Sequence, residues 1–205
     1  NMPRGARTGI AGRPLRQGRS ITVLSGTDQA GTAGHPYSGA ARAVVRARAA
    51  SAAQRRLWLL DRGGRAGSGY MASLVVPLAG ALDEQALGAA LDALAARHEP
   101  LRTVYREVDG EPTQRILPPG PVRLTRHDLD ADGHLAALAA EERRLPVDLA
   151  DGPVFRAVLA MRGGATVGLV LLVHHIAFDG WSIGILATEL GALYRAAAAG
   201  RSAGL

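Results

Sequence analysis

The stretch Val167-Gly-Leu-Val-Leu-Leu-Val-His-His-Ile-Ala-Phe-Asp-Gly-Trp-Ser182 decides how this chain folds. Its first seven residues contain almost no polar side chain, which predicts a strand buried on both faces. From Ser182 onward apolar residues recur at helical spacing, at positions 183, 186, 190 and 193. The stretch therefore predicts a buried strand, a short connection and a helix.

Two histidines, His174 and His175, stand where the strand is expected to end, and Asp179 and Gly180 precede the helix. Reactive groups are often found at such a junction, because a rigid strand fixes one side and helix N–H groups face the other. Neighbouring residues of an extended chain point to opposite faces. Only one of the two histidines can therefore face a cleft.

The rest of the chain alternates between helical and strand patterns. A capping-box pattern, Ser51 to Gln54, predicts a helix that ends at Gly63-Gly64. Pro77 suggests that the strand predicted over 74–79 is partly unpaired. Further helices are predicted over 83–97 and 133–144, and strands over 74–79, 103–107, 113–117, 124–128 and 155–161, with an Asp109-Gly110 turn. The predicted class is α+β, a mixed α/β two-layer sandwich with helices packed on a largely antiparallel sheet.

Charge divides the 205-residue chain. Residues 1–50 hold eight arginines and one acidic residue, whereas the remainder carries a net charge of −1. Residues 1–40 are rich in Gly and Arg and predict a basic, partly disordered linker or extension, in which the apolar patch 21–24 could form one strand. Residues 41–205 form the predicted folded lobe. No basic stripe is interleaved with aromatic residues, so we expect no nucleic-acid partner.

Composition narrows the chemistry further. The chain has no cysteine, which excludes disulfides, thiolate ligands and a cysteine nucleophile. No run of 18 apolar residues occurs and no secretory leader is recognisable, so we expect a cytoplasmic protein without a membrane partner. His175 and Asp179 could chelate a metal only if the segment between them curled. Since His98, His127 and His134 occupy no recognisable spacing, we expect no metal site.

Two further stretches add to the histidine pair. They are Ser51-Ala-Ala-Gln-Arg-Arg-Leu-Trp-Leu-Leu60 and Arg97-His-Glu-Pro-Leu-Arg-Thr-Val-Tyr105. In this order the three stretches resemble the condensation domains of nonribosomal peptide synthetases, whose motifs read Ser-x-Ala-Gln-x-Arg-Leu-Trp, Arg-His-Glu-x-Leu-Arg-Thr-x-Phe and His-His-x-x-x-Asp-Gly. The chain departs from the second motif at Tyr105. A weaker fourth match spans residues 145–156.

The resemblance covers roughly residues 45–205 and implies the N-terminal lobe of a V-shaped pair of chloramphenicol acetyltransferase-like lobes. It implies amide formation, in which an acceptor amine attacks a donor acyl thioester. His175 would act as the base or would position the amine, and both roles remain open. Because the family's active site lies between two lobes, we expect this chain alone to be inactive.

The resemblance also suggests roles for the residues around His175. His174 would support the fold by hydrogen bonding, and Gly180 would allow a close backbone approach. Asp179 would anchor the loop through an ion pair, with Arg102 as the first candidate partner and Arg56 as the second. Trp181 is expected to pack rather than to contact substrate.

The implied partners are donor and acceptor peptidyl carrier proteins, the second lobe and neighbouring synthetase domains. The carriers' 4′-phosphopantetheine arms would bring the substrates. The chain contains no carrier-like Asp-Ser-Leu sequence, so we expect it to hold no covalent cofactor. Two other interpretations stay open: a non-catalytic lobe that recruits or docks carrier proteins, and a small-molecule acyltransferase that uses coenzyme A.

Overall fold

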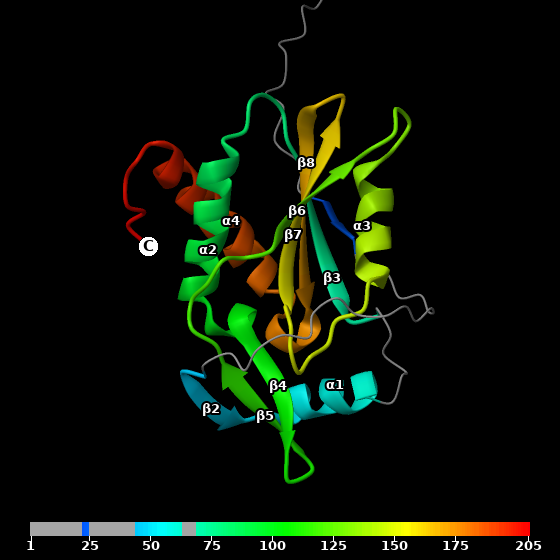
Figure 1. Cartoon of the computed structure of the whole chain (residues 1–205), viewed down its shortest axis with the longest axis vertical. Helices are drawn as coiled ribbons and strands as arrows, with labels where there is room; N and C mark the ends of the chain where they lie inside the picture. The colour runs from blue at the N-terminus through cyan, green and yellow to red at the C-terminus, as the bar shows by residue number, and fades with distance from the viewer. Residues whose placement is uncertain (1–21, 25–43, 63–68) are drawn as a thin grey trace, which may run out of the picture.

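The computed structural model describes residues 22–24, 44–62 and 69–205 (Figure 1). Its elements are β1 (Thr22–Leu24), β2 (Arg46–Ala49), α1 (Ala52–Arg62), β3 (Met71–Pro77), α2 (Glu84–Arg97), η1 (Glu99–Arg102), β4 (Thr103–Val108), β5 (Glu111–Ile116), β6 (Leu124–Asp128), α3 (Leu135–Arg144), β7 (Phe155–Arg162), β8 (Ala165–His174), η2 (His175–Ala177) and α4 (Ser182–Ala198).

A five-stranded sheet in the order β1-β3-β8-β7-β6 forms the centre of the fold. Its neighbouring strands run antiparallel except for the parallel pair β6 and β7. The predicted buried strand is confirmed as β8, in which every residue from Gly168 to His174 is buried. Pro77 ends β3 beyond its three-residue pairing with β1, so among the described residues this proline pairs on one side only, with Gly168 of β8.

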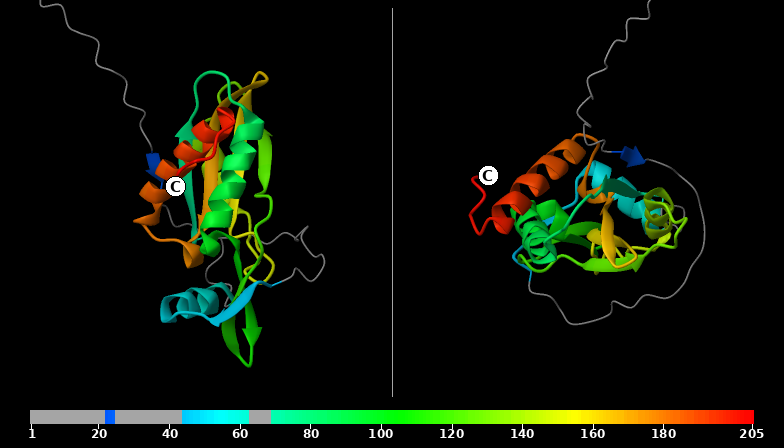
Figure 2. Two further views of the ribbon diagram at one scale, coloured as in Figure 1. Left: turned by 90° about the vertical axis from the view of Figure 1, so that its left-hand side faces the viewer. Right: turned by 90° about the horizontal axis from the view of Figure 1, so that it is seen from above.

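Helices cover both faces of this sheet. Residues Leu169, Leu171 and Val173 of β8 pack toward α2 and α4, while Val170 and Leu172 pack toward α3. Figure 2 shows α2 and α4 side by side, with α3 across the sheet from them. The predicted class is confirmed, but α3 adds a third layer to the expected two. The third layer follows from β8 itself, because a strand that is apolar on both faces needs cover on both.

A second, smaller sheet in the order β2-β5-β4 lies at one end of the molecule beside α1 (Figure 1). Its β4–β5 hairpin confirms the predicted turn: Asp109 and Gly110 have φ values of 52° and 82°, as a tight hairpin turn requires. Strand β2 was not predicted. Its four residues, Arg-Ala-Arg-Ala, are all exposed and show no buried face that sequence patterning could detect.

The predicted helix starts agree closely with the structure. Ser51 Oγ accepts the Gln54 N–H at 3.2 Å and Gln54 Oε1 accepts the Ser51 N–H at 2.9 Å, so the capping box is formed. Asp83 caps α2 by accepting the N–H of Ala86 at 2.9 Å. The third predicted helix begins two residues later than expected, at Leu135.

The N-terminal prediction can be compared at one place only. Thr22–Leu24 forms the expected strand, and the other residues of 1–40 lie outside the described part of the chain. Among the described residues, no helix is both long and apolar enough to cross a membrane.

Candidate active site

The two histidines separate at the end of β8. His174 is the last residue of the strand and is 2% exposed, whereas His175 begins the η2 turn and is exposed. The backbone N–H of His175 donates to the carbonyl of Tyr70 at 2.8 Å, which ties the turn to the segment before β3. As predicted, only one histidine faces outward, and it is His175. Its ring lies 5.6 Å from that of Phe178, centroid to centroid.

His174 is held inside the fold as a neutral ring. Its Nδ1 accepts the backbone N–H of Ile176 at 3.1 Å, so the proton of the neutral ring lies on Nε2. Burial, together with the neighbouring His175, lowers the pKa of His174 to about 4. Its Nε2 is buried and has no partner among the described residues. This geometry fits the supporting role predicted for His174.

Ile176, the residue after His175, is also fixed. Its side chain is buried with Trp58, Tyr105 and Leu149 in a cluster beneath the turn. Its carbonyl accepts a hydrogen bond from the hydroxyl of Tyr105 at 3.2 Å, and Gln54 Nε2 lies 3.5 Å from the same oxygen. Sequence reasoning missed these two polar contacts. The signal was present, because Gln54 and Tyr105 each belong to one of the other two motifs.

Asp179 is exposed and bonds to the start of α4. Its Oδ1 accepts both the hydroxyl of Ser182, at 2.7 Å, and the Ser182 N–H, at 3.0 Å. The hydrogen bonds from Ser182 lower the pKa of Asp179 below its usual value. The carboxylate therefore caps the first turn of α4 and fixes the loop to the helix.

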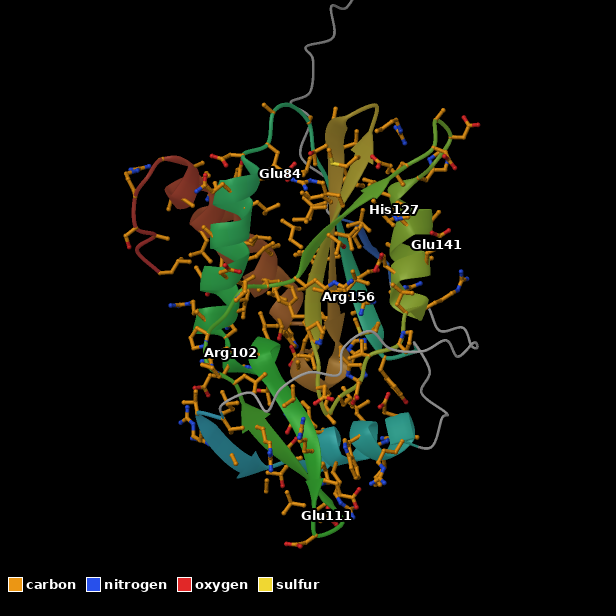
Figure 3. The ribbon with its side chains drawn as sticks, viewed as in Figure 1. Glu84, Arg102, Glu111, His127, Glu141 and Arg156 are labelled. Atoms are coloured by element: carbon orange, nitrogen blue, oxygen red, sulfur yellow. The ribbon has the colours of Figure 1, made fainter. Side chains whose placement is uncertain are left out.

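The predicted ion pair of Asp179 with Arg102 or Arg56 is wrong. Arg102, the last residue of η1, lies close to the C-terminal end of α2 (Figure 3) and donates to the carbonyls of Ala95, Ala96 and Leu117. Arg56 is exposed on α1 and makes no ion pair within the described segments. The prediction assumed a buried carboxylate, but an exposed one is hydrated and needs no cation.

The second motif also joins α2 to α4. Arg97 Nε and His98 Nε2 lie 3.1 Å and 2.6 Å from Oε2 of Glu189, a residue of α4. These contacts hold α4, the helix that follows the histidine turn, against the end of α2. A hollow of about 100 Å³ opens beside them, lined by His98, Pro100, Leu101, Ala177, Phe178, Ser182, Ile185 and Leu186.

The two residues before α4 differ from expectation. Trp181 is 89% exposed, so the expected packing of this side chain is wrong for this chain. At Gly180 an added Cβ would meet no atom within 4 Å. The close backbone approach expected at Gly180 therefore involves no neighbour in the described part of the chain. No group of three or more metal-ligating side chains occurs among the described residues.

The layered fold and the outward histidine at the end of β8 place this chain in the chloramphenicol acetyltransferase-like class. Within that class the particular family is clear. The family model described as Condensation domain matches residues 46–205 of the sequence. The chain therefore belongs to the condensation-domain family and is part of a nonribosomal peptide synthetase condensation domain.

Curated relatives are large synthetases. The chain is 42% identical over 157 residues to chondramide synthase cmdD of Chondromyces crocatus, a match that covers 74% of this chain and 4% of the synthase. It is 41% identical over 161 residues to phosphinothricin tripeptide synthetase PhsC of Streptomyces viridochromogenes, covering 76% of this chain and 15% of PhsC. The chain thus spans a small fraction of either relative.

Solved structures agree. The first condensation domain of the calcium-dependent antibiotic synthetase, in complex with a substrate analogue, is 25% identical with a TM-score of 0.69; the match covers 80% of this chain and 41% of that one. The X-domain from teicoplanin biosynthesis, in complex with OxyB, is 34% identical with a TM-score of 0.70, covering 84% of this chain and 38% of that one. The chain therefore spans well under half of each solved chain.

Proposed function

We propose that this chain supplies the histidine-bearing lobe, the N-terminal one, of a domain that forms amide bonds. The α-amine of an acceptor aminoacyl thioester attacks the carbonyl of a donor acyl or peptidyl thioester. A C–N bond forms, the C–S bond breaks, and the donor thiolate leaves and takes up the proton lost by nitrogen. The observation that carries the proposal is that His175 is exposed while its two neighbours, His174 and Ile176, are buried and hydrogen-bonded.

His175 serves this reaction as a base or as an acceptor that orients the amine. The nitrogen becomes cationic as it attacks, and a positioned imidazole that accepts its proton is worth typically ~10²- to 10⁴-fold in rate. Bringing amine and thioester together contributes separately, because well-oriented reactants have effective molarities of about 10⁵–10⁸ M. His174 is unsuited to either task, since it is buried and its Nδ1 is occupied.

The substrates in this proposal arrive on donor and acceptor carrier proteins, each as a phosphopantetheine thioester. The solved relatives are more than twice as long as the part matched here, so the remaining segment of the domain supplies the opposite wall of the site. Neighbouring synthetase domains present the carriers. The chain itself needs no covalent cofactor for this role.

A second candidate function is recruitment without catalysis. It is favoured by the 34% identity to the X-domain that was solved in complex with OxyB. Against it, the chain retains His174, His175, Asp179 and Gly180 of the condensation motif, and His175 is exposed. Retention of the whole motif favours the catalytic function.

The test uses the complete domain that contains this chain, with purified donor and acceptor carriers loaded with aminoacyl groups. Mass spectrometry of the acceptor carrier should detect a dipeptidyl thioester. Parallel reactions with the same donor on coenzyme A should form little product, since the carrier is the expected substrate. Faster transfer from coenzyme A would favour the small-molecule acyltransferase, and binding of the carriers without product would favour recruitment.

A further inference from the structure

We propose that Gln54 and Tyr105 are positioning residues for His175, acting through the carbonyl of Ile176. The inference rests on the function proposed for His175, but its geometry can be tested without that function. Gln54 lies in α1 and Tyr105 in β4. In sequence they precede Ile176 by 122 and 71 residues. These residues belong to the second sheet and its helix, whereas His175 follows the central sheet.

The hydrogen bonds form a directed chain. Ser51 N–H donates to Gln54 Oε1 at 2.9 Å, which identifies the amide oxygen and leaves Nε2 to donate elsewhere. Gln54 Nε2 donates to the Tyr105 hydroxyl oxygen at 3.0 Å, and that hydroxyl donates its own hydrogen to the Ile176 carbonyl at 3.2 Å. Gln54 thus fixes the direction in which the tyrosine hydroxyl points.

Burial keeps this chain intact. Tyr105 is 1% exposed and Ile176 is 3% exposed. Burial raises the pKa of the Tyr105 hydroxyl well above its usual value, so the group remains a donor throughout the working pH range. A carbonyl buried at this depth loses its contact with water and is costly to leave without a donor. The Ile176 carbonyl therefore keeps its orientation only while a donor remains beside it.

The effect on His175 follows from its place in the backbone. The Ile176 N–H donates to His174, the Ile176 carbonyl accepts from Tyr105, and the His175 N–H donates to Tyr70. The peptide groups around His175 are thus held from several directions, and the imidazole leaves the backbone along a fixed direction. A shift of the turn would move the reacting nitrogen, and even ~1 Å of misplacement can cost about 100-fold in rate.

Packing alone would not require the hydroxyl. A phenylalanine would fill the same place between Trp58, Leu149 and Ile176. The polar role of Tyr105 can therefore be separated from its packing role by a single-atom change.

The test compares Tyr105→Phe and Gln54→Glu with the parent in the complete domain. Gln54→Glu preserves shape and the acceptor for Ser51, but it removes Nε2, which donates to Tyr105 and lies 3.5 Å from the Ile176 carbonyl. Tyr194→Phe is the matched control, because it also removes one tyrosine hydroxyl, which accepts the Asp83 N–H at 3.1 Å on the α2–α4 side of the sheet. We expect both test variants to lower the maximal rate of amide formation about 10-fold at unchanged KM.

The second readout is NMR of ring-labelled histidine, with the His175 signal assigned by its loss in His175→Ala. Tyr105→Phe should move this signal, and Tyr194→Phe should not. An unmoved His175 signal in Tyr105→Phe would overturn the positioning role whatever the rate. If the parent domain forms no amide but Tyr105→Phe still moves the His175 signal, the result would support the positioning geometry and reject the proposed function.

Discussion

The N–H of Ile176 donates a hydrogen bond to Nδ1 of His174 at 3.1 Å, so the two residues that flank His175 are bonded to each other across it. Both flanking residues are buried, and His175 alone is exposed. A strand end could instead have left two mobile histidines in solvent. The bond makes the turn a rigid support for one outward imidazole.

Protonation of His174 should destabilise the chain. Its pKa is about 4 in the fold, against an ordinary value of 6.5, so the unfolded state binds the proton more tightly. Stability is fully present above pH 6.5 and declines as the pH falls toward 4, by at most ~3 kcal/mol. Urea unfolding measured at intervals from pH 7.5 to 4 checks this. The slope should shrink in His174→Asn and persist in His134→Asn, which changes an exposed histidine; equal slopes in both variants would contradict the assignment.

Asp61 should show the opposite dependence. Burial, and secondly the nearby Asp148, raise the pKa of Asp61 from 3.8 to about 6. The native state therefore binds this proton more tightly, and stability is lost as the pH rises from about 4 through 6. Allowing for solvent screening, Asp61→Asn should stabilise the chain by about 1–2 kcal/mol at pH 7.5, a gain that disappears near pH 4.

Thermal unfolding of Asp61→Asn at both pH values measures this effect, with Asp132→Asn as the control on an exposed carboxylate. A gain of equal size at pH 7.5 and pH 4 would show that charge on Asp61 is not its source.

Asp179 should act as a helix cap. Asp179→Ala removes the acceptor for Ser182 and should lower the melting temperature, whereas Asp179→Asn retains an acceptor oxygen and should lower it less. Because hydrogen bonds hold the Asp179 pKa down, this contribution should be present at neutral pH and lost as the pH falls below the ordinary carboxylate range. Equal melting temperatures for the parent and Asp179→Ala would exclude the cap.

Arg102 should stabilise the fold independently of Asp179. Its guanidinium satisfies the carbonyls of Ala95 and Ala96 at the end of α2 and of Leu117 after β5. Arg102→Ala should cost about 1–3 kcal/mol, because it leaves these acceptors without their donor. A double-mutant cycle with Asp179→Ala should be additive within ~0.5 kcal/mol. Strong coupling between the two substitutions would contradict this independence and would support an ion pair between Arg102 and Asp179.

Much of the fold could be predicted because its signals are local. The apolar run of β8, the capping box at Ser51, the Asp109-Gly110 turn and the acidic cap of α2 each depend on residues close together in sequence. Strand β2 was missed because all four of its residues are exposed and show no alternating pattern; within the described segments it is held by its pairing with β5.

Part of the geometry of the candidate site could also be predicted from the sequence. The sequence predicted that only one of His174 and His175 faces outward, and the structure shows this. The predicted partner of Asp179 was wrong, because sequence cannot show whether a carboxylate is buried. The hydrogen bonds of Gln54 and Tyr105 to the turn join three segments that are distant in sequence. Their motifs could be recognised, but only the packing of α1 and β4 beneath η2 brings these side chains to one carbonyl.

The most direct measurement is the single-turnover rate of amide formation by His175→Ala in the complete domain, with both carriers loaded and saturating. The rate should fall by about 10²- to 10⁴-fold. The melting temperature should equal that of the parent, since the side chain of His175 is exposed. His134→Ala, an exposed histidine on the α3 side, should retain the parent rate. Full turnover by a folded His175→Ala domain would contradict the account.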